Sequence, residues 1–189
     1  MIIKEKLLPL NQFSRPGYIR AETLGIVYHW TGAAGQENYV TRRFFELLAK
    51  QDEKDDKPDH YGSAHYIIGI DGEIIRCIPD DEVAYHVGAA SYTDLAKIDF
   101  PAYTTNKNRG TPNWCMIGIE MCHKDWSGEF TDETLRSAIE LGVLLLHQNR
   151  IPPGMIYRHY DITGKLCPKW FVEHEMDWTA FKTNLREEL

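Results

Sequence analysis

Runs of apolar residues predict several short strands along the chain. Residues 25–30, GIVYHW, end at a turn-forming TGAAGQ segment, and residues 116–122, MIGIEMC, form a second apolar run. The runs AHYIIGI and EIIRCIP flank Asp71 and Gly72, a dipeptide suited to a tight type I′ turn, so they predict a hairpin. A last short strand is expected within residues 151–159, IPPGMIYRH.

Helical periodicity marks three other segments. In residues 38–50 apolar side chains recur at i, i+4, i+7 and i+8, which predicts an amphipathic helix. The buried face of this helix is expected to comprise Val40, Phe44, Leu47 and Leu48. Thr131, followed by two acidic residues, has the form of an N-cap for a long helix with the apolar stripe Leu135, Ile139, Gly142, Leu145 and Leu146. A final helix is marked by Trp178, Phe181 and Leu185.

The segments between these elements have the composition of loops. Residues 51–62, QDEKDDKPDHYG, are charged and interrupted by proline, so we expect an exposed loop. A long irregular stretch is expected from Ser91 to Asn113, and loops of this length inside a compact domain are often functional. The order β, α, ββ, β, α, β, α predicts a single α/β domain over residues 1–189, with a central mixed β-sheet flanked by α-helices.

Composition narrows the classes of function. A hydrophobic fraction of 43% is that of a globular protein, and a net charge of −7 argues against a nucleic-acid partner bound mainly through its phosphates. There is no apolar run long enough to insert into a membrane. The N-terminal MIIKEKLLPLNQF does not have the pattern of a signal peptide, so we expect synthesis in the cytoplasm. We also expect a monomer.

The four cysteines do not suggest a disulfide framework. Three of them lie in apolar, strand-like runs, where a cysteine behaves as a small buried hydrophobe: Cys77, Cys115 and Cys122. Cys167 stands apart, in RHYDITGKLCP, eight positions after His159. Two imidazoles and a thiolate are good ligands for zinc, and three protein ligands leave a fourth position open, as in catalytic sites. His29 is a candidate second histidine, although a structural histidine would fit the same pattern.

Five motifs occur in order between about Gly25 and Trp170: YHWTG, SAHYIIGIDGEI, AYHVG, IGIEM and HYDITGKLCP. Together they resemble the zinc-dependent N-acetylmuramoyl-L-alanine amidases, a family that includes amidase-type phage endolysins and peptidoglycan recognition proteins. The resemblance implies one Zn²⁺ at the base of a substrate groove, held by His29, His159 and Cys167. It also implies hydrolysis of the amide between N-acetylmuramic acid and L-alanine in bacterial peptidoglycan.

The same resemblance implies two catalytic residues. Glu120 lies in an apolar strand, where an ionised carboxylate is costly without partners; a surface or ion-paired glutamate is the alternative. In the resembling enzymes the glutamate of this motif activates the attacking water, and the lysine two residues before the cysteine, here Lys165, stabilises the charge on the attacked carbonyl. Some phage members carry a tyrosine where this chain has Ala64, so Glu120 is the preferred base. His65, the next residue, is expected to support the site or the core.

Several residues are candidates for substrate binding. His86, in AYHVG, is a candidate groove residue, with an ordinary surface histidine as the alternative. Aromatic and amide side chains in or beside the long loop suit sugar or peptide ligands but also fill small cores: Tyr92, Tyr103, Asn113 and Trp114. Asp161 is expected either to orient a ligand or to form a local Asx-turn.

The biological role that fits the motifs best is a phage or prophage endolysin, which reaches the cell wall after release through a holin-type lesion or lysis. A C-terminal wall-binding domain, common in endolysins, would lie outside this chain. A peptidoglycan-binding receptor is the first alternative, but such receptors lack the metal cysteine. A cytosolic muropeptide-recycling amidase is the second, and those enzymes carry an acidic third ligand.

Overall fold

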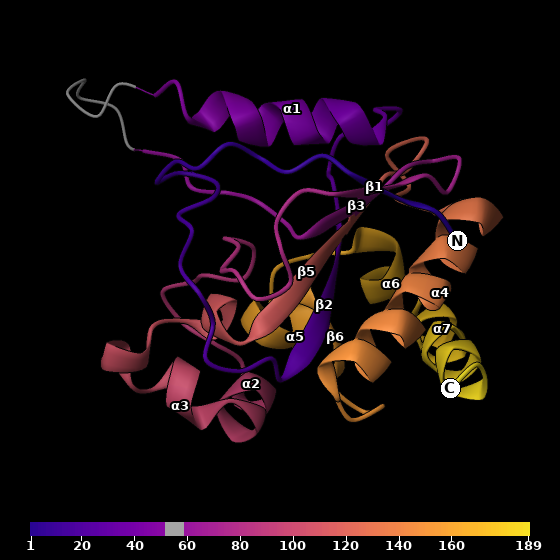
Figure 1. Ribbon diagram of the computed structural model, residues 1–189. Coiled ribbons are helices and arrows are strands. Elements are labelled where there is room, and N and C mark those ends of the chain that lie inside the picture. The colour runs from indigo at the N-terminus through magenta and orange to yellow at the C-terminus, as the bar shows by residue number, and fades with distance from the viewer. Residues whose placement is uncertain (52–58) are drawn as a thin grey trace.

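Six strands form one mixed sheet in the computed structural model, which describes residues 1–51 and 59–189. Their order across the sheet is β1-β4-β3-β5-β2-β6 (Figure 1). The strands are β1 (Ile3–Glu5), β2 (Gly25–Trp30), β3 (Tyr66–Ile68), β4 (Ile74–Arg76), β5 (Met116–Met121) and β6 (Ile156–Arg158). β3 and β4 pair antiparallel, and every other neighbouring pair is parallel. The predicted α/β fold with a central mixed sheet is confirmed.

Helices cover both faces of this sheet (Figure 1). On one face lie α4 (Asp132–Asn149) and α7 (Glu175–Glu187), and on the other lies α1 (Asn38–Leu48). The shorter helices are α2 (Asp94–Asp99), α3 (Pro101–Thr104), α5 (His159–Thr163) and α6 (Lys169–Glu173), with 3₁₀ turns η1 (Lys107–Arg109) and η2 (Pro112–Trp114). Among the described residues, none of the helices has both the length and the apolar character that a membrane crossing requires.

Side chains along β2 alternate between the two faces of the sheet. Ile26 and Tyr28 enter the core beneath α4 and α7, whereas Val27 packs on the opposite face, which it shares with His29. The Tyr28 hydroxyl donates a hydrogen bond to the Ala138 carbonyl of α4 at 3.0 Å. Gly142 permits this approach, because a Cβ atom there would lie 2.3 Å from the Tyr28 hydroxyl oxygen. Helix α4 therefore packs closely against β2, the strand that carries His29.

The hairpin between β3 and β4 is confirmed, but the type I′ turn predicted for it is wrong. A type I′ turn needs positive φ at both central residues. Here the turn runs from Gly69 to Gly72, closed by the Gly72 N–H donating to the Gly69 carbonyl at 3.0 Å. Gly72 has φ +81°, whereas Asp71 is not in the positive region. A turn followed by one glycine in the left-handed region is the G1-bulge arrangement.

The irregular stretch predicted from Ser91 to Asn113 is wrong in detail, because α2, α3 and two 3₁₀ turns lie within it. Thr93 caps α2 by accepting a hydrogen bond from the Ala96 N–H at 3.1 Å. Such short helices escape periodicity, which needs several turns to be recognised. β1 and α6 were missed for the same reason. Of the predicted loop 51–62, residues 52–58 lie outside the described residues.

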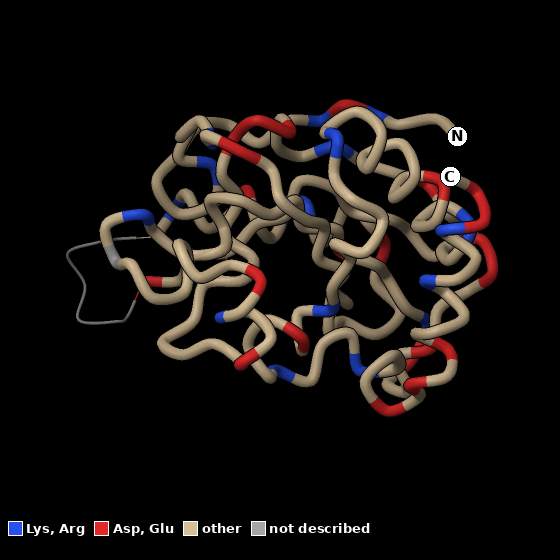
Figure 2. The backbone as a smooth tube through the Cα atoms, turned by 90° about the horizontal axis from the view of Figure 1, so that it is seen from below, with Lys and Arg blue, Asp and Glu red and all other residues tan. Residues whose placement is uncertain are grey.

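Lys and Arg positions lie among Asp and Glu positions along the backbone in the view of Figure 2. Several arginines are paired locally with carboxylates 2.7–3.2 Å away: Arg15 with Glu82, Arg76 with Asp80 and Arg158 with Asp161. Part of the positive charge of the chain is therefore neutralised in ion pairs within the protein.

The buried face predicted for α1 is wrong. Leu48 is 7% exposed, but Leu47 and Phe44 are 41% and 57% exposed. The face that meets the sheet carries Asn38, Thr41, Phe45 and Leu48. Two of these are polar, and the Asn38 side chain donates to the Glu73 carbonyl at 3.0 Å. A prediction that counts only apolar residues therefore assigns the wrong face of α1 to the sheet.

Two neighbouring leucines test this orientation. Leu48→Ala should lower the free energy of unfolding by about 2–3 kcal/mol, because it empties a buried site against the sheet. Leu47→Ala, the matched control, should cost less than about 1 kcal/mol, because that side chain is largely in solvent. Urea unfolding measures both, and equal losses would contradict the orientation.

Candidate functional site

Three parallel neighbours, β5, β2 and β6, bring their carboxyl ends to one edge of the sheet. His29, near the end of β2, is the register partner of Glu120 on β5. Register partners point to the same face, so these two side chains lie next to each other. His159 follows directly after β6 and is the first residue of α5. The carboxyl edge of a parallel sheet is the usual place for a site in such folds.

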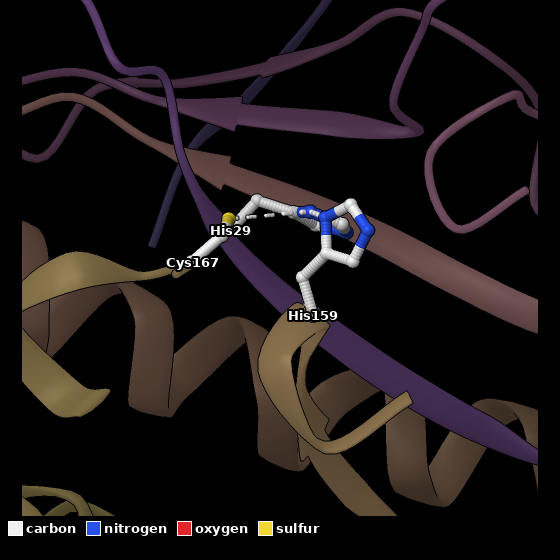
Figure 3. Close-up of side chains that lie close together, drawn as sticks. All are labelled: His29, His159 and Cys167. Atoms are coloured by element: carbon white, nitrogen blue, oxygen red, sulfur yellow. Dashed lines mark hydrogen bonds between the residues drawn. The ribbon is translucent and has the colours of Figure 1, made fainter. Parts of the chain in front are cut away.

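His29, His159 and Cys167 converge at this edge (Figure 3). All three are buried, and their donor atoms lie within 4.8 Å of one another. The Nδ1 atoms of the two histidines are 3.1 Å apart, and Cys167 Sγ is 3.8 Å from His29 Nδ1. The predicted trio is thus assembled from residues up to 138 positions apart in the sequence.

The spacing of these donors fits a tetrahedral metal ion. Bond lengths of about 2.0–2.1 Å to nitrogen and about 2.3 Å to sulfur place two nitrogen donors about 3.4 Å apart, and nitrogen about 3.6 Å from sulfur. The observed separations of 3.1 and 3.8 Å are close to these values. Burial raises the pKa of the Cys167 thiol, and a cation beside it would favour the thiolate. The cluster can therefore hold a metal ion.

A capping network fixes the start of α5. The Arg158 backbone N–H donates to Asp161 Oδ2 at 2.8 Å, and the guanidinium pairs with the same carboxylate. The guanidinium also donates to the Phe171 carbonyl and to Glu175. Asp161 therefore makes a capping contact with the backbone three residues before it, and the Asx-turn that was one of its two predicted roles is not the contact observed. This capping contact holds the first turn of α5, and so the backbone of His159, in place.

His86 lies beside His29 on the side away from the cluster. Its Nδ1 is 3.0 Å from His29 Nε2, and its Nε2 is 3.3 Å from the Met116 carbonyl. Asn113 Oδ1 accepts hydrogen bonds from the backbone N–H groups of His86 and Val87 at 2.9 and 2.8 Å. Both His86 and Asn113 line the pocket described below, so substrate contact through either stays a prediction.

Above the cluster opens a pocket of about 370 Å³. Its lining includes all three residues of the cluster, Glu120, and the exposed Lys165 at the rim. Sequence reasoning missed another part of the lining: Trp30, Thr31, Phe45, Tyr61, Ser63 and Tyr85. Trp30 and Tyr85 adjoin His29 and His86 within recognised motifs, which is the one signal that could have found them. Tyr61, 55% exposed, lies near the end of the predicted loop 51–62, where no motif marked it.

Among the described residues that line the pocket, Glu120 carries the one carboxyl group. Its Oε2 is shielded from solvent and has no hydrogen-bond partner among the described residues. Burial raises its pKa to about 8, against the opposing effect of the Lys165 ammonium group. Burial also lowers the pKa of His159 to about 4 and that of His86 to about 3. Near neutral pH the metal-free site thus holds neutral imidazoles beside a carboxyl group that can exchange a proton.

The remaining candidates lie outside this pocket. Tyr92 and Tyr103 line a neighbouring hollow of about 240 Å³, and Trp114 stacks on Tyr18 with ring centroids 5.5 Å apart. Substrate contact by these residues stays a prediction. His65 is fully buried, and its two nitrogens meet the Gly118 N–H and the Glu82 carbonyl at 3.0 Å. It supports the core, as expected.

Known proteins share this sequence pattern and fold. A family model described as N-acetylmuramoyl-L-alanine amidase matches residues 20–170. The chain is 34% identical over 174 residues to a probable N-acetylmuramoyl-L-alanine amidase of Bacillus licheniformis, which covers 92% of this chain and 44% of that protein. The chain spans about half the length of the curated relatives it matches.

Two solved structures share the fold. The catalytic domain of XlyA superposes with a TM-score of 0.68 at 22% identity, covering 98% of this chain and 99% of that one. A mutant endolysin from Bacillus subtilis gives a TM-score of 0.68 at 23% identity, covering 97% and 98%. At these identities the likeness concerns the fold.

The raised pKa of Glu120 predicts a pH-dependent cost to stability. Between the unfolded value near 4.5 and the folded value of about 8, the unfolded chain loses its proton while the folded chain keeps it, so stability falls as pH rises through this window. In metal-free protein, Glu120→Gln should therefore be more stabilising at about pH 9 than at about pH 5, by roughly 1–3 kcal/mol. Urea unfolding of both proteins at both pH values measures this difference, and a pH-independent effect of the substitution would contradict it.

Proposed function

The chain belongs to the N-acetylmuramoyl-L-alanine amidase family, and we propose that it hydrolyses the amide between N-acetylmuramic acid and L-alanine in bacterial peptidoglycan. One observation carries this proposal: His29, His159 and Cys167 converge at the base of a pocket whose wall holds Glu120. Two nitrogen donors and one sulfur donor for a metal ion, with a carboxylate nearby, form one set of groups that can hydrolyse an unactivated amide.

We assign the metal as zinc, held by the Nδ1 atoms of His29 and His159 and by Cys167 Sγ. The mixed nitrogen and sulfur donor set, buried and closely spaced, suits Zn²⁺ better than Mg²⁺ or Ca²⁺, which prefer oxygen. When bound, zinc supplies Lewis acidity toward a carbonyl oxygen and lowers the pKa of water.

The proposed roles of Glu120 and Lys165 follow from their places in the pocket. The Glu120 carboxylate accepts a proton from the attacking water and returns it to the departing amine of L-alanine. Its raised pKa suits both steps, because the group can lose and regain a proton near neutral pH. Lys165, exposed at the rim, places a positive charge where it stabilises the negative charge that develops on the attacked carbonyl oxygen.

An endolysin role is proposed on the same basis: a monomer made in the cytoplasm that meets the wall after release. Residues 1–189 would form its catalytic domain. Cys167 favours cleavage over simple binding, because it completes the donor set. Release of new free amino termini from purified walls tests this role. Binding without release would favour a receptor, and cleavage of soluble muropeptides but not of walls would favour a recycling enzyme.

Replacement of the sulfur donor tests the metal site. The purified protein should hold about one zinc ion per chain, and Cys167→Ala should weaken zinc binding at least about 100-fold and abolish wall lysis. Cys77→Ala is the matched control, because that thiol is equally buried but lies in the core behind β4. Zinc content by elemental analysis and affinity by chelator competition give the result. Normal zinc binding by Cys167→Ala would overturn the site.

Replacement of the carboxylate tests the base. Glu120→Gln should keep the zinc ion, because Glu120 is not among the three donors, and should lose at least about 100-fold in turnover. The rate of amino-terminus release per zinc-loaded enzyme measures the effect. Turnover near that of the wild type would show that another group accepts the proton.

A further inference from the structure

A chain of hydrogen bonds runs from the sheet to the proposed metal site through two imidazole rings. The Met116 carbonyl lies 3.3 Å from His86 Nε2, and His86 Nδ1 lies 3.0 Å from His29 Nε2. On the far side of the second ring, His29 Nδ1 faces His159 Nδ1 and Cys167 Sγ. His86 is 8% exposed and His29 is 2% exposed, so water has little access to either link.

The contact between His86 Nε2 and the Met116 carbonyl determines which atom donates in each of the other hydrogen bonds. A carbonyl oxygen can only accept, so the hydrogen on His86 must be on Nε2. A neutral imidazole has one N–H group, so His86 Nδ1 carries a lone pair and accepts from His29 Nε2. The hydrogen of His29 is then on Nε2, and its Nδ1 lone pair points at the cluster. The opposite tautomer of His29 would turn an N–H group toward the metal position.

We propose that His86 is a positioning residue that holds His29 in the Nε2–H tautomer, with the Nδ1 lone pair presented to the metal. This inference rests on the zinc site proposed above. A metal-binding histidine needs a partner on its other nitrogen, and loss of that partner commonly costs 10–100-fold in affinity. His86 fills this place with another imidazole, whose own orientation is set by the backbone of β5.

The surrounding residues are built to hold the His86 ring in this orientation. The ring lies against Gly118 of β5, where a Cβ atom would come within 2.6 Å of His86 Cγ. A glycine in a strand interior is otherwise unfavourable, and close approach of another group is one reason for its presence. Asn113 fixes the backbone at His86, and Arg20 donates a second hydrogen bond to the Met116 carbonyl. The His86 ring, the His86 backbone and the Met116 carbonyl that accepts from the ring are therefore each fixed by a different contact.

Two substitutions separate positioning from packing. His86→Leu fills the space but offers no acceptor to His29 Nε2, so zinc affinity should fall about 10–100-fold. His86→Asn places an amide oxygen near the position of Nδ1 and should recover part of that loss. Chelator competition measures affinity, and circular dichroism and urea unfolding confirm that each variant is folded. Zinc affinity of folded His86→Leu within about threefold of the wild type would overturn the proposal.

A second measurement needs no variant. In metal-free wild-type protein, the imidazole ¹⁵N chemical shifts should show His29 as the Nε2–H tautomer, and an Nδ1–H tautomer would overturn the proposal even if His86→Leu fails to fold. These measurements also distinguish failure of the proposed zinc site from failure of the proposed role of His86. If the wild type binds no zinc, the zinc site is wrong, whereas zinc binding with the Nδ1–H tautomer rejects the role of His86 alone.

Discussion

The structure depends on the parallel register that joins β5, β2 and β6. This pairing sets His29 opposite Glu120 and ends β6 one residue before His159, so residues from three distant segments reach one edge of the sheet. A shift of one residue in β2 would turn His29 into the core beneath α4 and bring Tyr28 or Trp30 to the site. The packing of Tyr28 under Gly142 opposes such a shift, because the tyrosine fits closely there. Packing of Tyr28 on the face covered by α4 thus keeps His29 next to Glu120 on the opposite face.

The site also shows how the fold keeps reactive groups close together. Two imidazole nitrogens and a sulfur atom, all buried, face one small volume. Such an arrangement is unfavourable without a cation, so it must be held by its supports. Those supports are the strand β2, the Arg158–Asp161 cap at α5, and His86 over Gly118. The strand and His86 both fix His29, and the cap fixes the backbone of His159.

Sequence reasoning reached the donors but not the geometry between them. The resemblance carried by the five motifs implied His29, His159 and Cys167 as a set, and the spacing of His159 and Cys167 pointed to the same pair. The pairing of His29 with Glu120 is non-local, so no local pattern contains it. The face of α1 was misplaced because Asn38 makes a polar contact with the sheet. The His86 ring occupies the space that a side chain at residue 118 would fill. Patterns of hydrophobic residues do not show that a glycine makes room for another side chain.

The helical segment between Ser91 and Asn113 is attached at both of its ends. Near its start, the Thr93 N–H donates to the Ile162 carbonyl at 3.0 Å, and its hydroxyl donates to the Asp161 carbonyl. At its end, Asn113 binds the backbone of His86 and Val87. These attachments lie on the supports of the His29–His159–Cys167 cluster, while the residues between them line a separate hollow. Substitutions in the middle of this segment can therefore reshape the hollow that it lines, while both attachments and the side chains that they hold beside the pocket stay in place.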